Sequence, residues 1–310
     1  MFRLGRTLLI FSLLAPVLAW SQSRIDCSAL HSRILRQTVH YCVLLPPSYD
    51  DPASNSAKRR YPVLYFLHGL GDNEQTLFKT GGWALIDDLR EQYKITEFLV
   101  VAPEGKQTFY IDSADGKVPY SDFFLREFMP HIEGKFRIRP GREGRGISGI
   151  SMGGYGALHY AFAHPELFSS VSAQSAALMI ESPKDLDTAE KSHSPLSGML
   201  ASVFGRPIDA RHWNENDPLM LAKINRGRLR DLAIYFNCGD EDNYGFDEGA
   251  KALHKELDSE GVRHEFHLYP GDHGPDYFLA HLAETMQFHS RVFDAGKAGS
   301  LRVSDRRAAP

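Results

Sequence analysis

Near-continuous apolar runs of strand length alternate with segments of helical spacing along most of the chain. The runs at residues 62–69 and 97–105 are apolar on both faces, which is typical of strands inside a parallel sheet that helices cover. Between them, residues 83–93 place apolar side chains at helical spacing. Because this alternation continues to about residue 293, the pattern predicts an α/β fold with a doubly wound, mostly parallel sheet.

The same two periodicities predict the other elements. Further strands are expected at residues 38–46, 145–150, 168–176, 231–239 and 263–271, and further helices at 120–136, 156–165, 247–261 and about 275–293. Pro130 lies within the apolar stripe of the helix at 120–136 and is expected to kink it.

Two segments fall outside the alternation. Residues 178–228 are polar, are interrupted by prolines and contain no run of strand quality. Since long loops in compact domains are usually functional, we expect a partly helical cap over the functional site. Residues 296–310 are polar and aperiodic, which predicts a disordered tail. We therefore expect one α/β domain at 24–295, with a cap-like insertion at 178–228.

The N-terminus has the layout of a secretory signal peptide. Arg3 and Arg6 precede an uncharged run at residues 8–20, and small residues follow at Ala19 and Ser21. The run is short for a bilayer-spanning helix. We expect residues 1–19 to be the signal peptide, with cleavage after Ala19 or Ser21, and a secreted or periplasmic protein without a stable membrane span. A buried N-terminal helix or an uncleaved anchor is the alternative.

Composition and charge narrow the class of partner. Of the 310 residues, 43% are hydrophobic and 24% are charged, and the formal net charge is −4. These values describe an ordinary globular domain without a basic face for phosphate backbones, so no nucleic acid partner is expected. The three cysteines match no zinc-binding pattern. In an exported protein Cys27 and Cys42 are the pair to test for a disulfide. Cys238 lies in a predicted apolar strand and is expected to be a buried thiol.

The stretch "GISGISMGGYGA", residues 146–157, contains the candidate nucleophile. Gly149, Ser151 and Gly153 match the G-x-S-x-G nucleophile elbow, in which a sharp strand-to-helix turn exposes a serine hydroxyl above a sheet. The glycines suit a turn that leaves no room for side chains. A glycine- and serine-rich loop is the alternative interpretation of this short pattern.

Candidate partners of Ser151 follow other predicted strands. Asp240 and Asp242 come after the strand at 231–239, and His273 comes after the last strand. Ligand sites of open α/β sheets lie at the carboxyl ends of the strands. The chain order serine, acid, histidine is that of an α/β-hydrolase. His273 would accept the serine proton, and the acid would orient the imidazole, but position alone does not choose between Asp240 and Asp242.

Acyl transfer also needs two N–H groups aimed at the oxygen that becomes negative. Met152, the residue after the nucleophile, would supply one of them. The loop at residues 68–70 would supply the other from Leu70, with His68 as a structural partner of that loop rather than a base.

Together the motifs of this chain resemble those of the Putative esterase family of α/β-hydrolases, which includes esterase D, feruloyl and acetylxylan esterases and mycolyltransferases. The likeness runs from about residue 35 to 293 and rests on "YFLHGLGDN", "APEG", "SDFFLREFMPHIEGKFRI", "RGISGISMGGYGALHYAFAHPELFSSVSAQSA", "NDPLMLA", "CGDEDN" and "YPGDHGPDYF".

The resemblance implies an α/β-hydrolase fold and favours Asp242 as the acid, because the family's acid follows glutamate in a C-G-x-E-D segment. It also implies that the amides of Leu70 and Met152 form the oxyanion hole. Where relatives often have G-G-H-D-W, this chain has residues 271–275 as G-D-H-G-P. His273 is thus kept, but the neighbouring aromatic residue is missing.

The leading hypothesis is a serine esterase that cleaves carboxylic esters through an acyl-enzyme, with neither cofactor nor metal. The substrate would be a small-molecule or carbohydrate-linked ester. The alternatives are an acyltransferase to a sugar or lipid acceptor, a thioesterase like S-formylglutathione hydrolase, and an inactive hydrolase-fold binding protein. In the insertion, Met179, Phe204 and Trp213 are candidate walls of a substrate pocket, or else anchors of a small core.

Overall fold

The computed structural model describes residues 23–51, 59–190 and 195–307. The signal peptide predicted at residues 1–19 lies outside this part of the chain. Among the described residues, no helix combines the length and the apolar character needed to cross a membrane.

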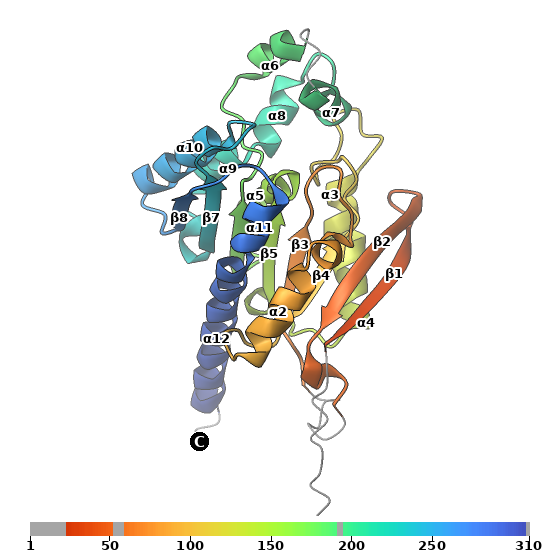
Figure 1. The fold of residues 1–310 in the computed structure, drawn as a ribbon, viewed down its shortest axis with the longest axis vertical. Coiled ribbons are helices and arrows are strands. Elements are labelled where there is room, and N and C mark those ends of the chain that lie inside the picture. The colour runs from red at the N-terminus through yellow and green to blue at the C-terminus, as the bar shows by residue number, and fades with distance from the viewer. Residues whose placement is uncertain (1–22, 52–58, 191–194, 308–310) are drawn as a thin grey trace, which may run out of the picture.

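An eight-stranded sheet forms the centre of the molecule, in the strand order β1-β2-β4-β3-β5-β6-β7-β8 (Figure 1). β1 pairs antiparallel with β2, and β2 with β4, whereas all other neighbours are parallel. The predicted fold class, an α/β-hydrolase with a mostly parallel sheet, is confirmed. The strands are β1 (Arg24–Ser32), β2 (Gln37–Leu45), β3 (Val63–Leu67), β4 (Leu99–Pro103), β5 (Arg145–Ile150), β6 (Ser170–Gln174), β7 (Ala233–Gly239) and β8 (Glu265–Tyr269).

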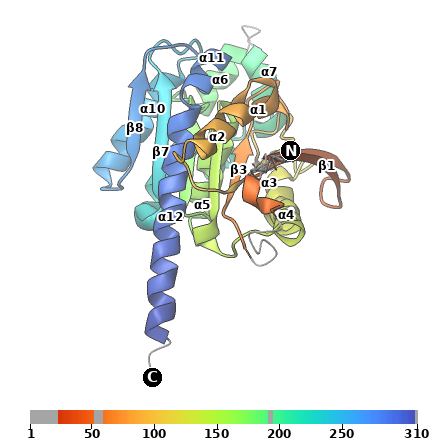
Figure 2. The same ribbon diagram turned by 60° about the horizontal axis from the view of Figure 1, so that its bottom comes forward.

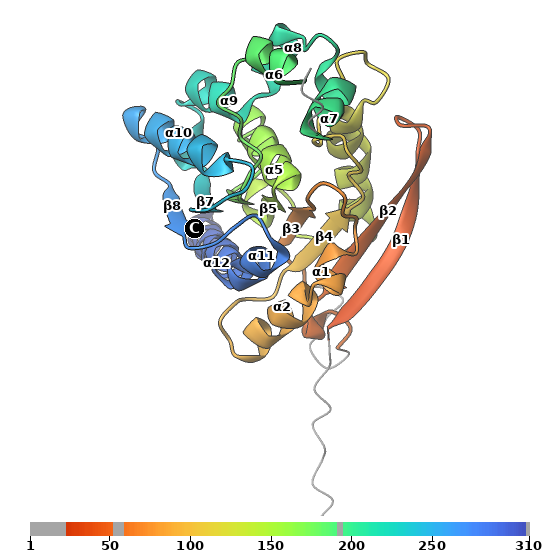
Figure 3. The ribbon, with the colours of Figure 1, turned by 45° about the horizontal axis from the view of Figure 1, so that its top comes forward.

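Helices cover both faces of the sheet. α2 and α12 pack on one face and α5 and α10 on the other (Figures 1 and 3). The helices are α1 (Thr76–Lys79), α2 (Gly82–Glu91), α3 (Tyr120–Phe123), α4 (Met129–Lys135), α5 (Met152–Ala163), α6 (Pro183–Glu190), α7 (Pro195–Phe204), α8 (Ala210–Asn216), α9 (Pro218–Asn225), α10 (Phe246–Ser259), α11 (Pro275–Ala280) and α12 (Leu282–Arg307), with short 3-10 or π segments η1 (Pro47–Tyr49), η4 (Phe124–Phe128), η5 (Arg142–Gly144) and η6 (Leu229–Asp231).

The continuous apolar runs reflect burial of both faces of the central strands. In β3, Tyr65 belongs to the larger apolar cluster, together with Leu158 of α5. The next residue, Phe66, belongs to the second cluster, together with Ile86 of α2 and Met286 of α12. Successive side chains of a strand point to opposite faces. Each central strand therefore contributes side chains to both apolar clusters.

The structure changes two expectations about the helices. The segment at 120–136 contains a π-helical turn, η4, directly before the turn that holds Pro130. Pro130 has no N–H for the carbonyl of Arg126, so the irregularity that the proline causes lies N-terminal to it. The predicted C-terminal helix is divided into α11 and α12 at His281.

The tail predicted at residues 296–310 begins within α12. The backbone of α12 remains helical to Arg307 and projects beyond the body of the molecule (Figure 2). Residues 308–310 lie outside the described residues.

The hairpin of β1 and β2 carries the disulfide. Cys27 and Cys42 are directly opposite each other in the antiparallel register, and their sulfur atoms are bonded. The pairing proposed from the sequence is thus present. Cys238, the remaining cysteine, is a buried free thiol.

A buried histidine joins α12 to the middle of the sheet. His289 is fully buried, its Nδ1 lies 2.7 Å from Oγ of Ser170, and its Nε2 lies 2.8 Å from Oγ of Ser172. Ser172 donates in turn to Oγ of Ser148 at 2.8 Å. The Ser172 oxygen must therefore accept from Nε2–H, which leaves Nδ1 to accept from Ser170. Burial lowers the pKa of His289 to about 3, because the interior disfavours the imidazolium.

This histidine should make the fold sensitive to acid. Since the pKa of His289 is lower in the folded chain than in the unfolded chain, the unfolded chain takes up more protons as the pH falls below about 6.5. Between pH 6.5 and pH 4, His289 alone should lower the free energy of unfolding by about 3 kcal/mol. We expect His289→Gln to be less stable at pH 7 but to lose less stability on acidification, as measured by urea unfolding. An equal pH dependence in both proteins would contradict this account.

Candidate active site

The turn between β5 and α5 places Ser151 in a backbone conformation that few side chains tolerate. Ser151 has φ 53° and ψ −120°. A Cβ atom on Gly149 would collide with the carbonyl of Gly153, and one on Gly153 would collide with the carbonyl of Leu67 on β3. The two glycines thus allow α5 to pack directly against the strands. This geometry is that of the predicted nucleophile elbow, with the serine at the carboxyl end of β5.

His273 connects the serine to a carboxylate. Its Nε2 lies 2.8 Å from Oγ of Ser151, and its Nδ1 lies 2.7 Å from Oδ2 of Asp242. The side chain of His273 is 8% exposed and that of Asp242 is fully buried, so little water competes for these hydrogen bonds. Because the carboxylate can only accept, it keeps the proton on Nδ1 and leaves Nε2 free to accept the serine proton.

The carboxylate of Asp242 is held in its ionised form. Burial by itself raises its pKa, but the hydrogen bond and the charge of His273 and the N–H of Tyr244, 2.9 Å from Oδ1, outweigh burial and lower the pKa overall. The thiol of Cys238 contacts Oδ2 at 3.5 Å. Burial raises the pKa of this thiol to about 12, so it remains a neutral donor.

Asp240 has a different place in the site. It is exposed, and its Oδ1 accepts a hydrogen bond of 3.1 Å from the N–H of Gly271. The N–H of Asp240 donates to the carbonyl of Tyr269 at 2.9 Å. Asp240 therefore ties the loop that follows β7 to the loop that carries His273. The structure brings Asp242, and not Asp240, to the imidazole.

Aromatic residues surround His273 although the expected neighbouring tryptophan is absent. Tyr244, Phe246 and Phe278 meet its ring edge-on, with centroids 4.9, 5.4 and 5.2 Å away. Phe246 begins α10, Tyr244 lies in the loop just before it, and Phe278 belongs to α11. They restrict the orientation of the imidazole and shield its hydrogen bonds from water.

The loop after β3 is anchored by His68. Its Nε2 accepts from the N–H of Gly105 at 2.8 Å, so Nδ1 carries the hydrogen and donates to the carbonyl of Gly69 at 2.8 Å. The N–H of Asp72 donates to the same carbonyl at 3.3 Å. Burial lowers the pKa of His68, which keeps the imidazole neutral. His68 thus has the structural position that the sequence suggested.

This anchoring orients the peptide that ends in Leu70. In a trans peptide the N–H points away from the carbonyl, so fixing the carbonyl of Gly69 also fixes the N–H of Leu70. The loop passes beside the serine, since a Cβ on Gly69 would lie 3.5 Å from Cβ of Ser151. Among the described residues, the N–H groups of Leu70 and Met152 donate to no backbone carbonyl outside the helices and strands. Both amides are therefore available to a substrate oxygen.

A cavity of about 730 Å³ opens beside Ser151 and His273. One part of its wall is apolar and is formed by Leu77, Ile150, Phe278, Leu279 and Leu282. These residues come from α1, β5, α11 and α12, and not from the insertion. Of the described residues in 178–228, none lines this cavity.

Met179, Phe204 and Trp213 do not line this cavity, and their burial favours the alternative that they are anchors of a small core. All three are buried, with exposed fractions of 6%, 0% and 3%. The ring of Phe204 packs 4.6 Å from that of Trp213 and 6.2 Å from that of Phe109, which does line the cavity. Their apolar area is buried against the body of the protein, so they anchor the insertion and support the pocket wall from behind.

The buried pair Ser170 and His289 is a second serine–histidine contact, which the sequence analysis did not identify. Both nitrogens of His289 are occupied by serine hydroxyls, and among the described residues no carboxylate bonds to its ring. Neither residue lines the cavity. Without access for a substrate or a carboxylate to stabilise an imidazolium, this pair is part of the core.

Comparison with known proteins identifies the family of this chain. A family model described as "Putative esterase" matches residues 32–289. The chain belongs to this family.

Individual relatives have esterase names. An acetyl esterase of Caldicellulosiruptor saccharolyticus is 27% identical over 278 residues, which cover 85% of this chain and 97% of that protein. An esterase of Mycobacterium tuberculosis is 29% identical over 257 residues, or 77% of this chain. The chain spans only about half of that relative, 54% of its length.

Solved structures show the same architecture. A ferulic acid esterase superposes with a TM-score of 0.73 at 26% identity, covering 87% of this chain and 99% of the other. An S-formylglutathione hydrolase from Staphylococcus aureus superposes with a TM-score of 0.70 at 21% identity, covering 87% and 100%, which shows the shared fold alone. The predictions of family and fold are confirmed: the chain belongs to the Putative esterase family and has an α/β-hydrolase fold.

The two aspartates after β7 should differ sharply in their effect on turnover. Asp242→Asn removes the charge opposite His273 and favours the wrong tautomer, so kcat should fall by roughly 10³- to 10⁴-fold. Asp240→Asn keeps an oxygen that can accept from Gly271 and should change kcat by less than about tenfold. Steady-state hydrolysis of a nitrophenyl ester measures both. A greater loss in Asp240→Asn would show that the acid is misassigned.

Proposed function

We propose that this protein is a secreted or periplasmic esterase that hydrolyses carboxylic esters through an acyl-enzyme on Ser151. The observation that carries the proposal is the continuous contact from Ser151 through His273 to Asp242, with distances of 2.8 and 2.7 Å. A serine hydroxyl is a weak nucleophile until a base accepts its proton, and His273 is the base within reach.

The reaction proceeds in two balanced halves. Oγ of Ser151 attacks the ester carbonyl as His273 Nε2 takes the hydroxyl proton, and the carbonyl oxygen becomes negative between the N–H groups of Leu70 and Met152. Collapse of this intermediate breaks the bond to the alcohol oxygen, which receives the proton from His273. Water then repeats the sequence on the acyl-enzyme, releasing the acid and restoring Ser151.

The cavity supports an ester with a large apolar arm. An acetyl group would occupy only a small part of about 730 Å³, and the wall of leucine, isoleucine and phenylalanine side chains gains from apolar contact. The ferulic acid esterase among the structural relatives has a name that indicates an aromatic acyl group. We therefore propose a substrate whose acyl group is aromatic or a medium-length alkyl chain.

Export of the protein is part of the proposal. It is supported by the predicted signal peptide and by the disulfide between Cys27 and Cys42, because structural disulfides persist mainly in oxidising compartments.

Removing the proposed nucleophile should abolish turnover. Ser151→Ala should reduce kcat by roughly a thousandfold or more on any ester that the protein cleaves, because no acyl-enzyme can form. Ser170→Ala is the matched control, since it removes the hydroxyl of the other serine–histidine pair and should leave kcat within about threefold. Product analysis with an added alcohol distinguishes hydrolysis from acyl transfer. If Ser151→Ala retained its rate, or Ser170→Ala lost it, Ser151 would not be the nucleophile.

The length of the acyl chain should govern the rate. If the acyl group lies on the apolar wall, each buried methylene contributes about 0.8 kcal/mol, or about fourfold in kcat/KM. We expect kcat/KM to rise from nitrophenyl acetate through butyrate to hexanoate, and methyl ferulate to be cleaved. A preference for acetate with a steady decline for longer esters would disprove the proposed acyl class while leaving Ser151 as nucleophile.

A further inference from the structure

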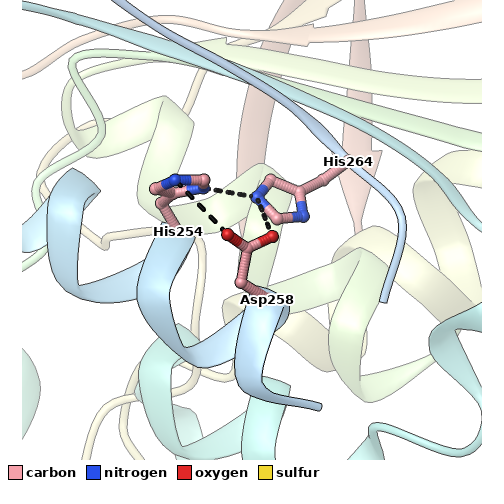
Figure 4. A group of neighbouring side chains, drawn as sticks. All are labelled: His254, Asp258 and His264. Carbon is pink, nitrogen blue, oxygen red and sulfur yellow. Dashed lines mark hydrogen bonds and ion pairs between the residues drawn. The ribbon is translucent and has the colours of Figure 1, made fainter. Parts of the chain in front are cut away.

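Two imidazoles and a carboxylate form a cluster beside α10, apart from the cavity (Figure 4). His254 and Asp258 are four residues apart on α10 and share one face of the helix. His264 directly precedes β8, after the turn at Gly261. One metal-ligating atom from each of the three side chains can be chosen so that all lie within 4.8 Å of one another. None of the three lines the catalytic cavity.

When both histidines are neutral, the hydrogen bonds of the cluster leave two acceptor atoms facing each other. His264 Nδ1 lies 2.8 Å from the carbonyl of Val262, so it must donate, and a neutral His264 therefore presents a lone pair at Nε2. That lone pair faces His254 Nδ1 at 2.7 Å, which must then be the donor. A neutral His254 consequently turns the lone pair of its Nε2 toward Oδ2 of Asp258, 3.6 Å away. Two acceptors facing each other repel unless a proton or a metal ion lies between them.

The spacing of the ligand atoms is close to what a metal ion needs. Zinc binds imidazole nitrogen and carboxylate oxygen at about 2.0–2.2 Å, so two ligand atoms of a tetrahedral ion lie about 3.3 Å apart. Nε2 of His254 lies 3.6 Å from Oδ2 of Asp258, Nε2 of His264 lies 3.9 Å from Oδ1, and one ligand atom from each of the three side chains lies within 4.8 Å of the others. An ion bound by both Nε2 atoms would replace the hydrogen bond of 2.7 Å between the two histidines and would draw the side chains together by roughly an ångström.

Packing already holds the two rings in place. His264 stacks on Phe236, with centroids 5.7 Å apart and planes at 16°, and His254 lies 4.8 Å from the ring of Phe266. The side chain of His264 is 3% exposed, whereas those of His254 and Asp258 are 41% and 64% exposed. The cluster thus has a rigid inner ligand and an open outer side through which a hydrated ion can enter.

We propose that His254, Asp258 and His264 bind a divalent transition-metal ion of the zinc type. The ion takes one ring nitrogen from each histidine and one oxygen from Asp258, and water completes its coordination. Two imidazoles and one carboxylate are a ligand set that zinc favours over the hard cations magnesium and calcium.

The ion would stabilise the part of the chain that separates two groups of the active site. α10 follows the loop of Asp242, and β8, the edge strand, leads into the loop of His273. An ion bound between α10 and the start of β8 would link the two segments on either side of the turn at Gly261. It takes no part in ester cleavage, so its effect is on stability rather than on kcat.

Metal titration of the full chain tests this site. The protein is freed of any purification tag and of bound metal with a chelator, and is then titrated with Zn²⁺ or Mg²⁺ by isothermal calorimetry. We expect one equivalent of Zn²⁺ to bind, no comparable binding of Mg²⁺, and a rise in the thermal unfolding midpoint with Zn²⁺. Co²⁺ in place of Zn²⁺ should give the visible absorption of a tetrahedral site.

Variants locate the ion. His254→Gln, His264→Gln and Asp258→Asn should each weaken Zn²⁺ binding by roughly tenfold or more, and each should abolish the rise in the unfolding midpoint. Asp258→Asn matters most, because this exposed residue can be changed without disturbing the core. His267→Gln, two residues into the exposed edge of β8, is the matched control and should bind Zn²⁺ normally. Absence of binding at millimolar Zn²⁺, or binding that survives Asp258→Asn and His254→Gln, would overturn the proposal.

Discussion

The conformation of Ser151 is the constraint on which the rest of the site depends. Its φ of 53° is unfavourable for a side-chain-bearing residue, and the surrounding backbone maintains it. The N–H of Ser151 donates to the carbonyl of Gln174 on β6 at 2.9 Å, and its carbonyl accepts from Tyr155 at 3.0 Å and Ala177 at 3.1 Å. The sheet and α5 thus fix the serine in an orientation that an isolated turn would not keep.

The other groups reach this serine because parallel strands end at the same edge of the sheet. β3, β5, β6, β7 and β8 are successive neighbours, so their following loops converge. Asp240 then links the loop after β7 to the one after β8, and His68 fixes the loop after β3. Catalytic groups that are far apart in the chain are thereby held by hydrogen bonds that do not themselves take part in the reaction.

The insertion and the stretch from α10 to β8 contribute indirectly. Phe204 of the insertion packs behind Phe109 of the cavity wall, so changes in the insertion can alter the pocket without any contact with a substrate. The cluster of His254, Asp258 and His264 lies between α10, which follows the loop of Asp242, and β8, which precedes the loop of His273. It can therefore affect both loops without contacting a substrate. Both features make the geometry of the site depend on packing well outside it.

The amino-acid sequence by itself determined the features that depend on local pattern: the alternation of strands and helices, the glycine-flanked turn at Ser151 and the placement of His273 after a strand. Position in the chain left Asp240 and Asp242 open and the family resemblance favoured Asp242, but only the tertiary structure shows which carboxylate reaches the imidazole. The structure also decided the place of Met179, Phe204 and Trp213, since an apolar side chain gains the same free energy against a core as against a ligand. His264 joins His254 and Asp258 only across a turn. The spacing of residues in the sequence indicates which of them lie on the same helix or strand. Contacts between helices and strands depend on how the sheet and its helices pack in three dimensions.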